Sequence, residues 1–273
     1  MKWIKPFLKQ FKRVIKPSGS IVIDIGGGWN KGLPTKSIYQ YKLIVMIVEE
    51  LGMNLIHDYF WWNPNKLPTP AEWVTIRRIR VKDSVNNIFW IAKTPYPKAS
   101  NKRVLNPYSK RMEHLLDNGY DPKKRPSGHK ISDKFSTRNN GAIPPNLLAV
   151  SSSSFSRDKY SKYCIENSLP MHDARFPYKI PEYFIRMTTN SGDLVLDPFA
   201  GSSTTGYVAN KLKRKWICVD SNRDFCEGGK GWFLKKDSKR KKKDNPIMIL
   251  QPITDDKILD KSPLNDSGGE RKK

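Results

Sequence analysis

Residues 193–220 read DLVLDPFAGSSTTGYVANKLKRKWICVD, and this stretch decides the fold. The apolar run 194–196 predicts a short buried parallel strand. The small-residue segment 197–206 follows it and opens a helical pattern that continues to about Leu212. A second apolar run then ends on Asp220. The stretch therefore predicts a strand, a turn, a helix and a second strand in that order.

This order is typical of a nucleotide-cofactor site. Glycine lets a ligand approach the backbone, and free N–H groups at the start of a helix bind polar ligand atoms. An acidic side chain at the end of the next strand binds ribose hydroxyls. The GxGxxG pattern of dehydrogenases is absent from the stretch. The sequence therefore indicates a different class of cofactor.

The segment DPFAGSSTT at 197–205 resembles the cofactor loop of the DNA amino-methyltransferases that use S-adenosylmethionine. Two more blocks, SGSIVIDIGG at 18–27 and HDARFP at 172–177, are similar to the same family. The block 63–94 looks like the family's late core motifs and fits best the enzymes that modify the exocyclic N4 of cytosine. The cofactor loop comes last, which implies a member with permuted motif order.

The resemblance implies a set of cofactor-binding residues. Within the loop and at the end of the second strand these are Asp197, Phe199, Gly201, Ser202, Thr204, Thr205 and Asp220. Beside the methionine end of S-adenosylmethionine the family pattern places His172, Arg175 and Phe176. Arg175 and Phe176 have an alternative interpretation, in which they only pack the start of the following helix.

The charge of the chain favours a polyanionic partner. The 273 residues include 50 basic and 26 acidic side chains, a formal net charge of +24, and double-stranded DNA is the expected partner. The three cysteines show neither disulfide nor metal spacing, and the four histidines form no cluster. No apolar run approaches the length of a membrane span. We therefore expect a cytoplasmic protein without a metal or a membrane.

The region 94–170 has a different character, because prolines, serines, asparagines and lysines dominate it. A loop of this length inside a compact domain is usually functional or disordered. In the family, the target-recognition region occupies this position, although a purely structural insertion remains an alternative. Basic side chains interleaved with aromatic ones suit contacts to DNA phosphates and bases. The predicted DNA-binding residues are Lys102, Arg103, Lys110, Arg111, Arg125, Lys130 and Arg138.

These features predict an α/β fold, a Rossmann-like S-adenosylmethionine-dependent methyltransferase with an irregular DNA-recognition insertion. The expected division is a catalytic-side half at 1–93, a target-recognition region at 94–170, a cofactor-binding half at 171–233 and a disordered basic tail at 234–273.

The family's acceptor motif, Ser/Asp/Asn-Pro-Pro-Tyr/Phe, does not occur in this sequence. Asn106-Pro107-Tyr108 lacks the second proline, and Pro144-Pro145 lacks the polar residue and the ring. We therefore predict no catalytic residue. The family segment that carries the motif also supplies two strands, one of them between the strands at 194–197 and 20–25. Without it the central sheet is expected to be incomplete, and each buried unpaired backbone group costs about 1–3 kcal/mol.

The resulting hypothesis is a site-specific DNA methyltransferase that modifies cytosine N4 within a restriction-modification system, functionally linked to a cognate restriction endonuclease. The missing motif implies an N-terminal truncation or an N-terminal complementing fragment. One alternative is adenine-N6 methylation, because the motif that best separates the two activities is missing. Another is a catalytically inactive remnant that binds DNA.

Overall fold

The computed structural model describes residues 2–119, 137–152 and 158–234. The predicted basic tail lies outside the described residues after its first position. The helices are α1 (Ile4–Val14), α2 (Tyr39–Val45), η1 (Met46–Glu50), η2 (Glu72–Ile76), η3 (Asn101–Arg103), α3 (Lys110–Asn118), α4 (Lys159–Glu166), α5 (Lys179–Thr188), α6 (Thr204–Lys211), α7 (Arg223–Gly229) and η6 (Lys230–Trp232). The strands are β1 (Ser20–Gly26), β2 (Gly28–Trp29), β3 (Lys36–Ser37), β4 (Asn54–Trp62), β5 (Val85–Ala92), β6 (Leu147–Ala149), β7 (Leu194–Asp197) and β8 (Lys215–Cys218).

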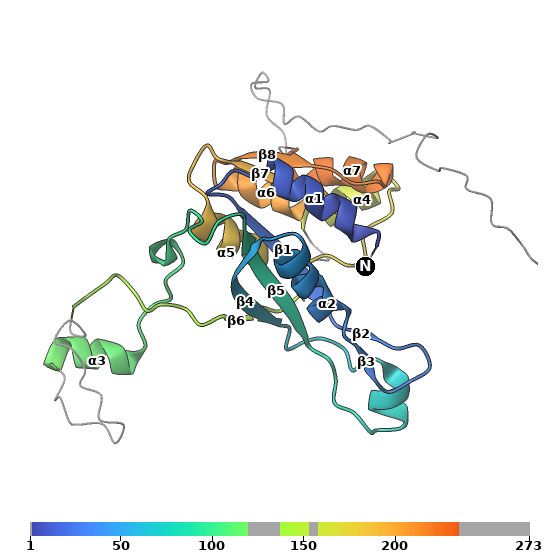
Figure 1. Cartoon of the computed structure of the whole chain (residues 1–273), viewed down its shortest axis with the longest axis horizontal. Coiled ribbons are helices and arrows are strands. Elements are labelled where there is room, and N and C mark those ends of the chain that lie inside the picture. The colour runs from blue at the N-terminus through green and yellow to red at the C-terminus, as the bar shows by residue number, and fades with distance from the viewer. Residues whose placement is uncertain (1, 120–136, 153–157, 235–273) are drawn as a thin grey trace, which may run out of the picture.

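The larger sheet has the strand order β1-β5-β4-β6 (Figure 1). Strand β5 runs antiparallel to both β1 and β4. The apolar segments 54–62 and 86–93, separated by a polar, Arg-rich connection, predict an antiparallel pair at a sheet edge. The pair is present, but β1 and β6 flank it, so it is not at the edge. One core cluster contains Leu8 of α1 and Ile47 of η1 together with Ile91 of β5. A second cluster joins Ile88 of β5 to Phe184 of α5. Helices therefore cover the sheet because their apolar residues recur at helical spacing.

The smaller sheet consists of β7 and β8 in parallel. Helix α6 connects these strands and buries Val208 and Ala209 beside Trp216 of β8. Helix α4 packs against α7 and η6 through Tyr160 and Cys164. The strand–turn–helix–strand order predicted from the sequence is therefore present, and it forms the core of the half that is predicted to bind the cofactor.

Two elements of the predicted recognition region belong to the core instead. Strand β6 pairs with β4 in parallel and extends the larger sheet. Helix α4 belongs to the cofactor side, where Tyr160 and Cys164 are fully buried. We therefore restrict the prediction of a target-recognition region to the segment between η3 and β6.

The two sheets are not hydrogen-bonded to each other within the described parts of the chain, where β7 pairs only with β8 and β1 only with β5. The predicted incomplete central sheet is thus confirmed. The expectation that β7 is buried is wrong, because Leu194 is 57% exposed and Leu196 is 45% exposed. The reason is that side chains alternate between the two faces of a strand: Val195 packs against the α6 side, whereas Leu194 and Leu196 point to the opposite face, which is left open to solvent.

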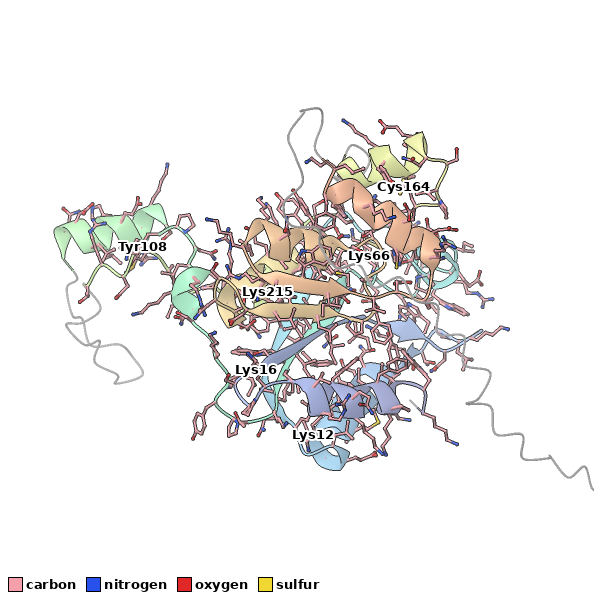
Figure 2. All side chains as sticks on the ribbon, turned by 90° about the horizontal axis from the view of Figure 1, so that it is seen from above. Lys12, Lys16, Lys66, Tyr108, Cys164 and Lys215 are labelled. Carbon is pink, nitrogen blue, oxygen red and sulfur yellow. The ribbon has the colours of Figure 1, made fainter. Side chains whose placement is uncertain are left out.

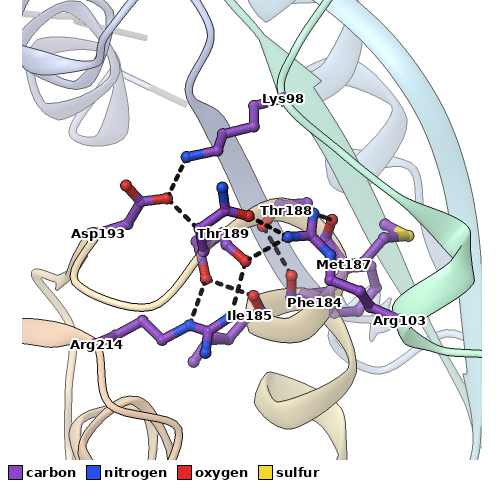
Figure 3. A network of polar contacts seen from close by, with 10 residues as sticks. Lys98, Arg103, Phe184, Ile185, Met187, Thr188, Thr189, Asp193 and Arg214 are labelled. Atoms are coloured by element: carbon purple, nitrogen blue, oxygen red, sulfur yellow. Dashed lines mark hydrogen bonds and ion pairs between the residues drawn. The ribbon is translucent and has the colours of Figure 1, made fainter.

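Helix α5 and a polar network hold the two halves together (Figure 3). The Lys98 Nζ atom, in the connection after β5, lies 2.6 Å from the Asp193 carboxylate just before β7. This hydrogen bond lowers the pKa of Asp193. Arg103 donates to the carbonyl of Thr189 at 3.0 Å, and Arg214 donates to the same carbonyl at 2.7 Å. Both guanidinium groups therefore satisfy backbone oxygens at the end of α5.

None of the helices that the structure describes is both long enough and apolar enough to cross a membrane.

Candidate cofactor site

The ends of β7 and β8 bring two carboxylates to one edge of the smaller sheet. In the parallel register Asp197 lies opposite Cys218, and Asp220 follows two residues later. The connecting loop closes over this edge, because the Ala200 N–H donates to the Val219 carbonyl at 3.0 Å. The Gly201 N–H donates to Asp220 Oδ2 at 2.7 Å. The carboxyl ends of parallel strands are where α/β proteins bind ligands.

Asp197 fixes the shape of the loop with both of its carboxylate oxygens. Oδ1 accepts a hydrogen bond from the Phe199 N–H at 3.1 Å, and Oδ2 accepts one from the Thr205 hydroxyl at 2.6 Å. Burial raises the pKa of Asp197, and the nearby charge of Asp220 raises it further. Asp197 and Thr205 therefore hold the backbone of the loop in position.

Position 201 requires a glycine, both for its backbone conformation and for the space around it. Its φ of +49° lies in the left-handed region, and a Cβ atom there would lie 2.9 Å from the ring of His172. His172 thus contacts the loop from the segment before α5. Its Nδ1 atom is buried and has no hydrogen-bond partner within the described residues. A buried polar atom without a partner is rare in a native protein and suits a site that a ligand completes.

Ser202 and Thr204 are buried at the start of α6. Their hydroxyl oxygens lie 2.9 Å apart, and the Ser202 carbonyl accepts a hydrogen bond from Trp232 Nε1 at 2.7 Å. Ser203 between them adopts a left-handed φ of +57°. Phe199, by contrast, is 51% exposed, and its ring centroid lies 5.3 Å from that of Phe7 in α1. The loop is therefore held by buried polar contacts on one side, and its Phe199 ring is half-exposed on the other.

The side chains of Arg175 and Phe176 are engaged elsewhere. Arg175 forms an ion pair of 2.9 Å with Asp158, the N-cap of α4, and stacks over the Tyr160 ring at 4.8 Å. Phe176 packs against the core cluster around Tyr59 of β4. These contacts favour the alternative in which both residues pack the segment before α5, and we leave them out of the proposed cofactor contacts.

Comparison with known proteins identifies the family to which this chain belongs. Residues 1–231 match the family model N6_N4_Mtase, described as DNA methylase. The chain belongs to the DNA methylase family. This membership confirms the resemblance drawn from the cofactor loop and from the two other sequence blocks.

Relatives of the methylase are similar along most of its length. It is 46% identical over 235 residues to the type II methyltransferase M.PvuII of Proteus hauseri, which is 85% of this chain and 70% of the relative. It is 26% identical over 225 residues to the orphan methyltransferase M.BamHII of Bacillus amyloliquefaciens, covering 80% and 76%. The solved structure of the cytosine-N4-specific PvuII DNA methyltransferase matches with a TM-score of 0.71 and 37% identity, covering 87% and 71%. The predicted methyltransferase fold is confirmed.

A partly buried carboxyl group in β1 of the methylase, Asp24, was not singled out by the sequence reasoning. Asp24 Oδ1 accepts a hydrogen bond from Asn86 Nδ2 at 3.0 Å, across the pair of strands β1 and β5. Burial raises the pKa of Asp24 from 3.8 to about 6, while the Asn86 hydrogen bond and the charge of Lys66 lower it in part. A lone Asp inside the apolar run SIVIDIG was the signal that could have identified it.

We expect Asp24→Asn to stabilise the methylase above about pH 6. The folded pKa of Asp24 lies above the ordinary 3.8, so stability is full below 3.8 and falls as the pH rises through about 6. Asn mimics the protonated carboxyl and avoids this loss, worth about 1–3 kcal/mol near pH 8. Urea unfolding of both proteins from below 3.8 to above about 6 on the pH scale measures the effect. If the difference in unfolding free energy between the two proteins does not grow between these two pH values, the assignment is contradicted.

The predicted DNA-binding residues lie in three kinds of environment. Lys102, Lys110 and Arg111 are exposed, the last two on α3, which projects away from both sheets in two perpendicular views (Figure 1, Figure 2). Arg138 pairs with Asp117 at the end of the same helix. Arg103 donates from both terminal guanidinium nitrogens to backbone carbonyls at the end of α5, so we leave it out of the proposed DNA contacts. The two other predicted positions, Arg125 and Lys130, lie outside the described residues.

The thiols of the methylase are not reactive groups. Cys164, Cys218 and Cys226 are buried and free. Burial raises the pKa of Cys218 to about 12 and also raises that of the other two. Since the thiolate is the nucleophile and the metal ligand, these residues pack as small apolar side chains.

Proposed function

We propose that the methylase is a site-specific DNA methyltransferase that transfers the methyl group of S-adenosylmethionine to the exocyclic N4 of cytosine. The observation that carries the proposal is the 46% identity to the type II methyltransferase M.PvuII across both halves of the fold. The solved PvuII enzyme is described as cytosine-N4-specific. By the same likeness, the methylase belongs to a restriction-modification system with a cognate endonuclease, and it acts on DNA in the cytoplasm.

The site at β7 and β8 fits S-adenosylmethionine. Asp220, whose carboxylate is already oriented by the Gly201 and Asn222 N–H groups, is placed to accept hydrogen bonds from ribose hydroxyls. The backbone at Gly201 allows close approach, and the free His172 Nδ1 offers a polar atom beside it. The exposed Phe199 ring offers an apolar surface. When bound, the cofactor supplies a methyl group on a positively charged sulfur.

The acceptor half of the reaction needs a further segment. An exocyclic amine is a weak nucleophile because its lone pair is delocalised into the base, so oxygen atoms must accept its hydrogens. The printed sequence holds no Ser/Asp/Asn-Pro-Pro-Tyr/Phe motif for this task. We propose that a complementing segment supplies this motif together with a strand between β1 and β7. The single strand partners of β1 and β7 support this position.

Nucleoside analysis tests the proposal. The purified chain is incubated with unmethylated plasmid DNA and S-adenosylmethionine, with and without the part of M.PvuII that the match does not span. The DNA is then digested and its bases are identified by mass spectrometry. We expect N4-methylcytosine only in the complemented reaction. N6-methyladenine would instead support the alternative specificity, and N4-methylcytosine from the chain alone would contradict the need for a complementing segment.

A further inference from the structure

A second projection leaves the larger sheet in a direction different from that of α3 (Figure 1). We name it the basic arm and define it as residues 27–38 and 63–84. The first part contains the β2–β3 hairpin and follows β1 directly. The second part connects β4 to β5 and contains η2. The arm therefore starts at the ends of β1 and β4, next to the Asp24–Asn86 pair.

The charge of the basic arm is strongly one-sided. Its residues include seven basic side chains and two acidic ones. Both carboxylates are paired within the arm. Glu72 lies 2.7 Å from Arg77, and Asp83 lies 3.1 Å from Lys36. The remaining positive charge therefore has no carboxylate of the arm to balance it.

Part of this positive charge holds the arm in shape. The Arg80 guanidinium lies 3.8 Å from the centre of the Trp29 ring and donates to the Pro34 carbonyl, which joins the connection to the hairpin. Lys82 donates to the carbonyls of Pro64 and Lys66 at 3.1 and 3.2 Å. These non-covalent contacts hold the two parts of the arm together, so its cations are not all independently solvated.

Two exposed cations, Lys31 and Arg78, take no part in this internal scaffold. Neither forms a hydrogen bond or an ion pair within the described ranges, 2–119, 137–152 and 158–234. Lys31 lies in the hairpin turn. Arg78 has a left-handed φ of +55°, which is unfavourable for an arginine. The hydrogen bond of 3.0 Å from the Ile79 N–H to the Trp73 carbonyl closes the backbone around this turn.

Large aliphatic side chains close to Arg78 in the chain are also exposed. Ile76 is 68% exposed, Ile79 is 61% exposed and Val81 is 86% exposed. A solvated charged surface explains cations but not a group of uncovered aliphatic side chains, which marks an interaction site. Cations for phosphates together with aliphatic groups for sugars and base edges are what a DNA groove requires.

We infer that the basic arm is a second DNA-contacting surface of the methylase, with Lys31 and Arg78 binding phosphates and the aliphatic residues at 76, 79 and 81 packing against the groove. The inference rests on the proposed function, since that function supplies the DNA. It differs from the predicted recognition region, which lies on the α3 side. With DNA contacts on both projections, the duplex would be held from two sides beside the end of β1.

Fluorescence anisotropy of a labelled duplex tests the inference on the full chain. The variant Lys31→Gln with Arg78→Gln removes the two cations without touching the scaffold of the arm. Lys162→Gln with Lys215→Gln is the matched control, because it removes two exposed lysines from α4 and β8 on the cofactor side. We expect the arm variant to bind DNA about tenfold more weakly and to reduce the slope of log affinity against log salt by about two. Thermal unfolding checks that all three proteins fold equally well.

The outcomes separate the inference from the proposed function. If the unmodified chain binds no DNA even at low salt, the proposed function and the inference both fail. If it binds DNA but the arm variant matches the control in affinity and in salt slope, the inference alone fails. A second variant, Ile79→Ser with Val81→Ser, distinguishes a DNA surface from one that binds a protein. Weaker DNA binding at an unchanged salt slope supports the inference, and unchanged DNA binding overturns the role of the aliphatic residues.

Discussion

Asp220→Ala is expected to weaken the binding of S-adenosylmethionine at least about 100-fold. Asp220 Oδ2 accepts the Gly201 N–H at 2.7 Å, and Oδ1 accepts the Asn222 N–H at 2.9 Å. The substitution leaves these two donors unpaired and removes the proposed acceptor for ribose hydroxyls. Hydrogen bonds to a charged group contribute about 1.5–3 kcal/mol each, and every 1.4 kcal/mol corresponds to about tenfold in affinity.

Isothermal titration calorimetry measures this loss. Asp224→Ala is the control. Asp224 is an exposed acidic residue in the first turn of α7, and its substitution removes the same charge close to Asp220. The control should bind the cofactor as the unmodified chain does, within about threefold. If Asp220→Ala bound equally well while remaining folded, the cofactor would have to lie elsewhere.

Trp232→Ala is expected to lower the free energy of unfolding by about 3–5 kcal/mol. The Trp232 ring is buried and stacks between Tyr207, at a centroid distance of 4.5 Å, and Tyr160, at 6.1 Å. Its Nε1 atom also donates to the Ser202 carbonyl at 2.7 Å. The substitution therefore opens a cavity and leaves a carbonyl of the cofactor loop without its donor.

Urea unfolding followed by circular dichroism provides the measurement. Trp232→Phe keeps much of the packing but loses the indole N–H, so it should cost less than the alanine variant. Trp3→Ala removes the same ring from a position that is 66% exposed, and it should cost under about 0.5 kcal/mol. Equal losses from Trp232→Ala and Trp3→Ala would show that η6 does not support the loop.

Features that depend on local pattern could be predicted from the sequence. The order of β7, α6 and β8 follows from apolar runs and small residues within 28 consecutive positions. The pairing of β4 with β5 follows from two apolar strands near each other in the chain. Asp197 and Asp220 lie at the same edge of the smaller sheet because the carboxyl ends of parallel strands lie side by side. These predictions needed no knowledge of distant contacts.

Features that depend on distant partners could not be predicted in this way. Arg103 looks like a DNA-binding residue in a basic segment, but its partners are carbonyls 84 and 86 residues away. The short strand β6 is recognisable only through its register with β4. The exposure of Leu194 and Leu196 has the same origin, because an apolar run predicts burial whether or not a distant part of the chain covers that face of the strand.

Hydrogen–deuterium exchange with and without S-adenosylmethionine tests most directly the claim that the cofactor binds at the ends of β7 and β8. The backbone N–H groups whose exchange the cofactor is expected to change are those of residues 199–206 and 220–222, together with the segment around His172. We predict that saturating cofactor slows exchange in these segments and leaves α3 unchanged. If saturating cofactor left exchange at 199–206 and 220–222 unaltered, or protected another part of the chain instead, the assignment of the site would be wrong.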